Sequence, residues 1–175
     1  YRLRCHGTYA ASRAGGLVER MPHAPHYQET KFNDLNGGIE RHFEPIKDYI
    51  ADGQILYSML NFCSRTFGTI SPLCDWHIEV HQFRILAKEG GGKPTPEGLH
   101  RDGVDFLMMA LMTRQNVLDG ETRVVDMYDR EIARFTLTQP FEAVMVNDLR
   151  VAHGVSPILP LSSDKPGYRD MLAIT

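Results

Sequence analysis

The sequence lacks long apolar runs and has few cysteines. None of its apolar stretches approaches the roughly 18 residues that a membrane-spanning helix needs, and residues 1–5 contain no apolar region of a signal peptide. The three cysteines, Cys5, Cys63 and Cys74, are an odd number at unrelated spacings. This pattern argues against a disulfide framework or a zinc ribbon. These absences predict a protein of the reducing cytoplasm that has no membrane span.

An excess of charge of one sign is also missing. The 22 acidic and 19 basic residues give a net charge of −3 and are mixed along the chain, without a run of five like charges. A protein that binds nucleic acid or an anionic membrane needs a concentrated basic surface. The composition therefore argues against both as main partners.

The composition that is present is typical of one globular domain. The chain has 175 residues, of which 42% are hydrophobic and 23% charged, so a single domain over residues 1–175 is expected. A chain of this length buries roughly two thirds of its unfolded surface and needs no metal or disulfide to fold. A bound metal would therefore serve chemistry.

The periodicity of the apolar residues divides the chain into three zones. Residues 1–38 read as extended chain and loop, with a strand through Tyr9. Residues 39–67 carry apolar side chains at helical spacing, interrupted at Gly53, which predicts two helices packed on a sheet. Pro45 lies inside the first helical pattern, so that helix is expected to start either before this proline or at it.

From Trp76 onward the pattern changes to short strands separated by turns. The absence of helical spacing between them favours an antiparallel sandwich or jelly roll over a parallel sheet. The predicted fold is mainly β with an α-helical cover (α+β). Residues 1–70 would form an N-terminal extension with the cover helices, and residues 76–175 the jelly-roll core. The expected strands are 76–87, 104–114, 121–128, 131–138, 142–147, 150–155 and 168–175.

The sharpest local pattern is a histidine and an aspartate in a loop rich in proline and glycine. His100 and Asp102 are two residues apart, so on an extended backbone their side chains project from the same face, as neighbouring metal ligands would. Another histidine, His153, lies in a later predicted strand. Two imidazoles and one carboxylate form the facial set of non-haem Fe(II) oxygenases, and the absence of a thiolate argues against structural zinc.

An arginine follows in the last predicted strand. Arg169 lies 16 residues after His153 in an apolar segment, and a buried guanidinium needs an anionic partner. The adjacent Asp170 points to the opposite face of the strand, so it is a poor partner. A small dicarboxylate held by a bidentate pair would satisfy Arg169.

These motifs resemble the bacterial 2-oxoglutarate/Fe(II) dioxygenases that include free L-amino acid hydroxylases of the isoleucine type and related biofilm and stress proteins. The most specific part is Pro-x-Pro-Glu-Gly-x-His-x-Asp-Gly, and the resemblance runs through residues 28–41, 94–103, 146–157 and 169–175. It implies a double-stranded β-helix, a cupin-like jelly roll. It also implies Fe(II), the cosubstrates 2-oxoglutarate and O2, and hydroxylation of a small substrate such as a free amino acid, with decarboxylation of 2-oxoglutarate to succinate.

The resemblance assigns roles to four residues. His100, Asp102 and His153 would hold the iron and form the catalytic centre. Arg169 would bind the distal carboxylate of 2-oxoglutarate.

Alternation along two strands predicts further residues of the pocket. Gln82 and Arg84 continue an otherwise apolar face, where polar side chains are costly in a closed core but suited to the mouth of a site. Val104 and Phe106 continue the alternation of the two iron ligands in the loop, so they would line the cavity or pack in the core.

Several other polar residues are interpreted as structural. Asp148 and Arg150 flank the turn before His153 and are expected to form a polar pair, while Glu121 would lie at the surface end of a strand. Among the histidines without ligand spacing, His81 is notable because it lies in a predicted strand.

Two other functions stay open from the sequence. One is a cupin-like metal enzyme that does not use 2-oxoglutarate, in which Arg169 would have no anionic partner. The other is a non-catalytic small-molecule sensor on the same barrel. The substrate, the oxidised carbon and the oligomeric state, including a homo-oligomer, are left undetermined by the sequence.

Overall fold

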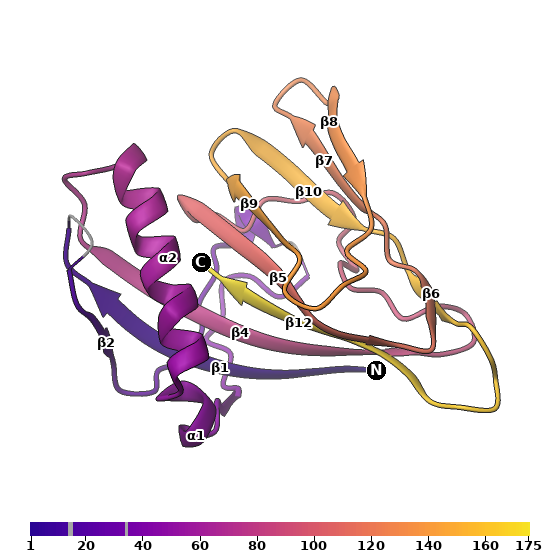
Figure 1. Ribbon diagram of the computed structural model, residues 1–175. Coiled ribbons are helices and arrows are strands. Elements are labelled where there is room, and N and C mark those ends of the chain that lie inside the picture. Colours follow the sequence, from indigo (N-terminus) through magenta and orange to yellow (C-terminus); the bar gives the residue numbers. More distant parts are fainter. Residues whose placement is uncertain (14–15, 34) are drawn as a thin grey trace.

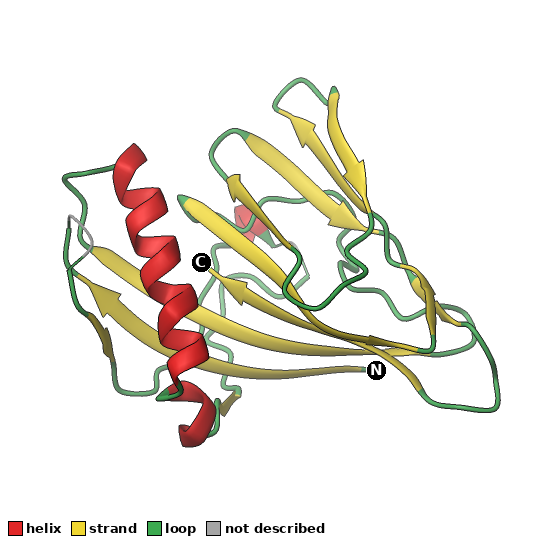
Figure 2. Cartoon of the chain, viewed as in Figure 1, coloured by secondary structure: helices red, strands yellow, loops and turns green. Residues whose placement is uncertain are grey.

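A large twisted sheet dominates the computed structural model, which describes residues 1–13, 16–33 and 35–175 and is mainly β with few helices (Figure 1 and Figure 2). The strand order in this sheet is β2-β1-β4-β12-β5-β9. The short strand β3 pairs in parallel with Cys5 and His6 of β1. The strands are β1 (Arg2–Ala11), β2 (Val18–Arg20), β3 (Glu44–Pro45), β4 (Trp76–Ala87), β5 (Phe106–Gln115), β9 (Ala143–Asn147) and β12 (Gly167–Ile174).

Two smaller antiparallel sheets complete the β structure. One has the order β10-β7-β8 and the other pairs β11 with β6. In Figure 1 the strands β7, β8 and β10 lie together beyond β5 and β9, on one side of the large sheet. These strands are β6 (Val117–Asp119), β7 (Thr122–Asp126), β8 (Glu131–Phe135), β10 (Val151–Val155) and β11 (Ile158–Pro160).

The helix α2 (Gln54–Ile70) packs against the large sheet. Its buried apolar residues recur at intervals of three and four, which gives the helix one apolar face. The ring of Phe67 stacks on Phe106 of β5 with 4.6 Å between centroids. The core between helix and sheet contains Leu56, Leu60, Cys63, Phe67, Ile78, Val80, Phe106, Met108 and Ile174, among others.

Two shorter helices accompany α2. They are the 3-10 helix η1 (Thr30–Phe32) and α1 (Asp48–Ala51). In the described part of the chain, no helix is both long and apolar enough to cross a membrane.

The observed elements differ from the predicted ones mainly in the first half of the chain. Of the two predicted starts of the helix before Gly53, the one before Pro45 is wrong, because Pro45 lies in β3 beside β1. The helix begins after this proline, but α1 has only four residues and is shorter than predicted. Proline cannot supply the backbone N–H that a helix interior needs. The strand through Tyr9 is ten residues long and pairs with β4 along its whole length, so this N-terminal segment belongs to the large sheet.

The packing of α2 on the sheet generates a stability prediction. Leu60 is fully buried in this core, and replacing it with alanine removes contacts and leaves a cavity. We expect Leu60→Ala to lower the free energy of unfolding by about 2–5 kcal/mol, measured by urea denaturation. Ile55→Ala on the same helix is the control, because Ile55 is 66% exposed, and it should change stability by less than about 0.5 kcal/mol. Equal effects of the two substitutions would contradict this packing.

Candidate functional site

His100 and His153 are joined through their backbones. The N–H of each residue donates to the carbonyl of the other, at 2.9 Å in both directions. This isolated antiparallel bridge connects the loop before β5 to β10 and brings the two imidazole rings to 4.7 Å between centroids. The main chain, and not side-chain flexibility, therefore sets how close the two histidines are.

Asp102 completes a three-residue group with these histidines. His100 Nε2 lies 3.6 Å from Asp102 Oδ1, and His153 Nε2 lies 3.6 Å from Asp102 Oδ2. One ligand atom of each residue lies within 4.8 Å of the other two. His100 Nδ1 donates to the carbonyl of Gly98 at 3.1 Å, which leaves Nε2 available to a metal. Two imidazoles and a carboxylate at these distances fit a divalent ion such as Fe(II).

The electrostatics of the group agree with a site for a cation. Burial opposes ionisation of Asp102, but hydrogen bonding to His100 and the charge of the histidines outweigh it and lower the pKa of its carboxyl to about 2. Burial likewise opposes protonation of His100, yet the neighbouring Asp102 raises its pKa to about 9. The carboxylate is thus charged at neutral pH and stabilises positive charge beside it.

The carboxylate of Asp148 fixes the loop that carries Asp102. Asp148 is fully buried, and its carboxylate accepts the backbone N–H groups of Asp102, Gly103 and Val104 at 3.1, 2.9 and 3.3 Å. The side chain of Arg101 donates to the carbonyl of Asp148 at 2.6 Å. The predicted Asp148–Arg150 pair is therefore wrong, because Asp148 turns inward to bind the loop while Arg150 is exposed.

Close approach of the backbones requires a glycine beside His153. A Cβ atom at Gly154 would lie 2.8 Å from the carbonyl oxygen of Gly98, which is shorter than a van der Waals contact permits. The glycine after His153 thus allows β10 to approach the loop closely enough to form the bridge between the two histidines.

Arg169 lies on β12 and is 1% exposed. It is opposite Ile85 of β4 and Arg114 of β5. Its Nε atom is buried without a partner, and no carboxylate of the described residues forms an ion pair with it. Burial, together with the charge of Arg114, lowers the pKa of Arg169 to about 10, so the group stays charged at neutral pH and lacks an anion.

The three potential metal ligands and Arg169 line the same cavity. Its volume is about 140 Å³. The wall also contains Arg4, Arg41, His81, Phe83, Ile85, Glu97, Val104, Leu107, Met109 and Thr122, among other residues.

The predicted pocket residues Gln82 and Arg84 lie outside this cavity. The cavity is lined instead by the other face of β4, which carries His81, Phe83 and Ile85. Arg84 is exposed and forms two hydrogen bonds of 2.7 and 2.6 Å with the carboxylate of Asp170. The face with Gln82 and Arg84 begins under α2 but continues past the helix into solvent, which explains its change from apolar to polar.

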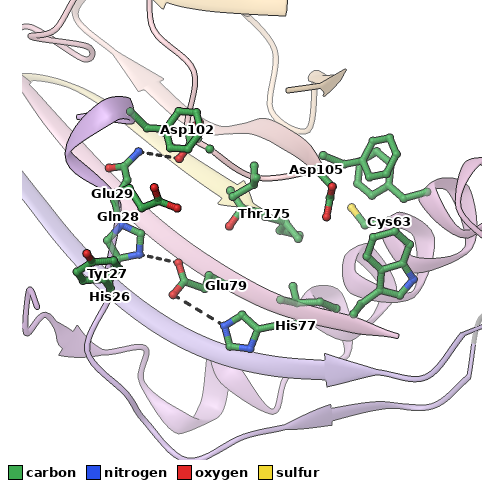
Figure 3. A pocket seen from close by; sticks show the side chains of 18 of the residues that line it. His26, Tyr27, Gln28, Glu29, Cys63, His77, Glu79, Asp102, Asp105 and Thr175 are labelled. Atoms are coloured by element: carbon green, nitrogen blue, oxygen red, sulfur yellow. Dashed lines mark hydrogen bonds and ion pairs between the residues drawn. The ribbon is translucent and has the colours of Figure 1, made fainter. Parts of the chain in front are cut away.

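Val104 and Phe106 differ in their surroundings. Val104 lines the cavity with the potential metal ligands and also a neighbouring cavity of about 500 Å³ beside α2, which Figure 3 shows, whereas Phe106 lines only the second and packs in the core. The predicted alternation does not continue into β5, because residues 103–105 bend before this strand begins. Leu107 and Met109 therefore take the cavity positions on β5.

Sequence reasoning missed several polar residues of the site, and four of them matter most for the argument. Arg4, Gln28 and Arg41 line the cavity, and Asp148 holds its loop. Gln28 and Arg41 lie in a segment that resembled the dioxygenases, but nothing in their spacing indicated a role. Arg4 lies two residues from His6 in a strand whose pairing with β4 was not predicted.

The contacts of Asp148 predict its effect on metal binding. Asp148→Asn keeps the shape of the side chain but replaces one accepting oxygen with a donor that faces backbone N–H groups. We expect about 10- to 100-fold weaker binding of a divalent metal, measured by calorimetric titration with Mn(II). Asp164→Asn, at an exposed position, is the matched control and should bind as the unmodified protein does. Unchanged affinity in Asp148→Asn would show that the loop holds its shape without this carboxylate.

Solved structures resemble the chain over nearly its whole length. A bsmA homolog from Methylobium petroleophilum PM1 is 39% identical, with a TM-score of 0.82, over 100% of this chain and 71% of that one. IDO from Bacillus thuringiensis is 22% identical, with a TM-score of 0.81, over 99% of this chain and 77% of the other. The second likeness shows the fold alone.

Sequence comparison finds a curated relative and a family. The 3(1)-hydroxy-L-isoleucine 4-dioxygenase of Pantoea ananatis is 27% identical over 156 residues, which are 85% of this chain and 62% of the relative. This chain therefore spans less than two thirds of that protein. The family described as 2OG-Fe dioxygenase matches residues 1–175. The resemblance inferred from the motifs is thus confirmed, and the chain belongs to the 2OG-Fe dioxygenase family of non-haem iron oxygenases, whose cofactors are Fe(II), 2-oxoglutarate and O2.

Proposed function

We propose that this chain is a dioxygenase dependent on Fe(II) and 2-oxoglutarate that hydroxylates a small molecule, and that its substrate is a free L-amino acid. The observation that carries the proposal is one cavity that holds His100, Asp102, His153 and the unpaired Arg169. The family match supports the reaction type. The name of the relative from Pantoea ananatis supports an amino acid as the substrate.

Each residue has a distinct task in this proposal. His100, Asp102 and His153 would bind the metal from one side and leave positions for 2-oxoglutarate and O2. Bound Fe(II) supplies the redox chemistry in which 2-oxoglutarate is decarboxylated to succinate and CO2, one oxygen atom of O2 ending in succinate and the other in the substrate hydroxyl. Arg169 would bind the distal carboxylate and so fix the orientation of the cosubstrate.

The lining of the cavity also fits this proposal. The buried side chains of Leu107 and Thr122 form part of the wall that the potential metal ligands share. Ligands bound in the cavity would displace water from it, which strengthens electrostatic interactions inside.

We extend the proposal to the fold and the compartment. The large sheet and the sheet β10-β7-β8, with the cavity residues divided between them, support a double-stranded β-helix over a single domain of residues 1–175. The cysteines Cys5, Cys63 and Cys74 are all free, which supports a reducing cytoplasm.

The reaction is tested by product analysis. The protein is incubated with Fe(II), 2-oxoglutarate, O2 and each free L-amino acid in turn, and succinate and hydroxylated product are quantified. We expect equal amounts of succinate and hydroxylated product with at least one amino acid.

His100→Ala should reduce the rate at least about 100-fold, since catalysis depends on the bound metal. Arg84→Gln, outside the cavity, should keep the rate within about twofold, as surface changes usually do. Succinate formed with none of the amino acids would refute the proposed substrate class.

The role of Arg169 is tested separately. Arg169→Gln removes the charge but keeps a side chain of similar length, so the loss reports mainly on the ion pair. We expect the KM for 2-oxoglutarate to rise about 10- to 100-fold, which corresponds to about 1.5–3 kcal/mol for a charge-assisted hydrogen bond. The KM for the amino acid should change little. An unchanged KM for 2-oxoglutarate would favour a metal enzyme that does not need this cosubstrate.

A further inference from the structure

Two arginines form a second cationic region in the same cavity. Arg4 of β1 and Arg41, in the loop before β3, both line the cavity that contains the metal ligands. Among residues 1–13, 16–33 and 35–175, no carboxylate forms an ion pair with either guanidinium. The Nε atoms of both are buried without a partner. Two neighbouring, partly buried cations that have carboxylates nearby but none within ion-pair distance are costly to hold together, and the cavity offers space for an anionic group between them.

The guanidinium of Arg4 is held in a defined position. It lies over the ring of Phe43 at 4.1 Å and near the ring of Phe83 at 4.9 Å, and its Nη2 donates to His81 Nδ1 at 2.8 Å. Burial, with like charge from Arg41 and Arg2, lowers the pKa of Arg4 to about 9. The group therefore remains charged at neutral pH and is preorganised for an anionic ligand.

Arg41 is connected to the metal group by a glutamine. Its Nη2 donates to Gln28 Oε1 at 3.1 Å, and Gln28 Nε2 donates to the carbonyl of Asp102 at 2.8 Å. Figure 3 shows the bond between Gln28 and Asp102. Arg41 also lies 5.8 Å from the ring of Phe43, the same ring that supports Arg4. Two hydrogen bonds thus fix the place of Arg41 relative to an iron ligand.

A buried network lies behind Arg4. His26 Nδ1 lies 2.6 Å from Glu79 Oε2, and His81 Nε2 lies 3.3 Å from the same oxygen; Figure 3 shows His26 directed at Glu79. Because Arg4 donates to His81 Nδ1, that nitrogen accepts, and the proton of His81 is on Nε2 facing Glu79. Glu79 thereby fixes the tautomer of His81 that holds Arg4.

The same cluster is close enough to be considered as a second metal site. Ligand atoms of His6, His26, Glu79 and His81 lie within 4.8 Å of one another. A metal on His81 Nε2 would require a proton on Nδ1, where Arg4 already donates, and arginine cannot accept a hydrogen bond. A second cation beside Arg4 would also add repulsion. The cluster is therefore better explained as support for Arg4.

We propose that Arg4 and Arg41 form a subsite that binds the carboxylate of the substrate, and that Glu79 and His81 are positioning residues for Arg4. This inference rests on the proposed function and specifies how its substrate is recognised. The subsite is separate from that of the cosubstrate, because Arg4 and Arg169 lie on β1 and β12, which flank β4 on opposite sides. Phe83 and Ile85 of β4 line the cavity between them.

The test measures binding without turnover. Protein loaded with Mn(II) and 2-oxoglutarate is titrated by calorimetry with each proteinogenic L-amino acid, and the tightest ligand is compared with its carboxamide. We expect Arg4→Gln and Arg41→Gln each to weaken binding of the amino acid at least about tenfold. Arg65→Gln, an exposed arginine of α2, is the matched control and should bind normally. Affinity for 2-oxoglutarate should be unchanged in all three, which also shows that the variants are folded.

The carboxamide identifies the group that the arginines bind. The carboxamide should bind the unmodified protein at least about tenfold more weakly than the amino acid. Arg4→Gln should cause little further loss of carboxamide affinity, because the two changes remove the same interaction between the carboxylate and Arg4. Additive losses would overturn the assignment. Arg4→Lys should bind with intermediate affinity, since it keeps the charge but loses the planar fork.

The positioning role of Glu79 has its own readout. Glu79→Gln should raise the KM for the amino acid with little change in kcat, and should leave carboxamide binding unaffected. A merely structural role would weaken amino acid, carboxamide and 2-oxoglutarate binding together, which would contradict positioning through His81.

The outcomes separate this inference from the proposed function. If an amino acid yields succinate but binds equally well to Arg4→Gln and Arg41→Gln, the subsite is wrong and the proposed function stands. If amino acids bind through the two arginines but none yields succinate, the subsite stands and the proposed function fails. If no amino acid binds the unmodified protein, the subsite is refuted.

Discussion

The paired backbone hydrogen bonds between His100 and His153 are the constraint on which the site depends. They join the loop that precedes β5 of the large sheet to β10 of the sheet β10-β7-β8, so the cavity between these sheets and the spacing of the imidazoles are set together. Gly154 permits this approach, and the buried carboxylate of Asp148 binds the loop from behind through three backbone N–H groups. The main chain therefore sets the spacing of the potential metal ligands independently of any bound metal.

The second feature of the cavity is the positive charge of the arginines in its wall. The chain as a whole has a net charge of −3, yet its cavity wall contains Arg4, Arg41 and Arg169 without a described carboxylate partner. Aromatic faces and neutral acceptors such as Phe43 and Gln28 support these cations without neutralising them. The cavity wall thus stays positively charged, which under the proposed function would attract anionic ligands and would let their binding stabilise the fold.

The sequence predicted the parts of the structure that depend on local pattern. Strand 76–87 was predicted with the bounds that the structure has, because alternation and flanking turns are local, and the family followed from the motif around His100. The cavity face of β4 could not be predicted, because it depends on where α2 ends above the sheet. Phe106 was expected to line the cavity or to pack in the core, and the sequence could not decide between these, because the bend over residues 103–105 that places it in the core has no local signal. Arg4 was missed because its role arises only when β1 pairs with β4.

Side chains of β4 alternate between the core and the cavity, so residues that matter for stability and residues that face the cavity lie on opposite faces of one strand. Ile78 and Val80 pack in the core beneath α2, so substitutions there act on the free energy of unfolding. His81 and Phe83 face the opposite way, toward the cavity and its arginines, where substitutions act on ligand binding. A strand has a period of two, so a shift of one residue in the pairing of β4 would exchange these faces. Long antiparallel pairing with β1 and β12 on both sides fixes the register, and the same hydrogen bonds that stabilise the sheet therefore also determine which side chains face the cavity.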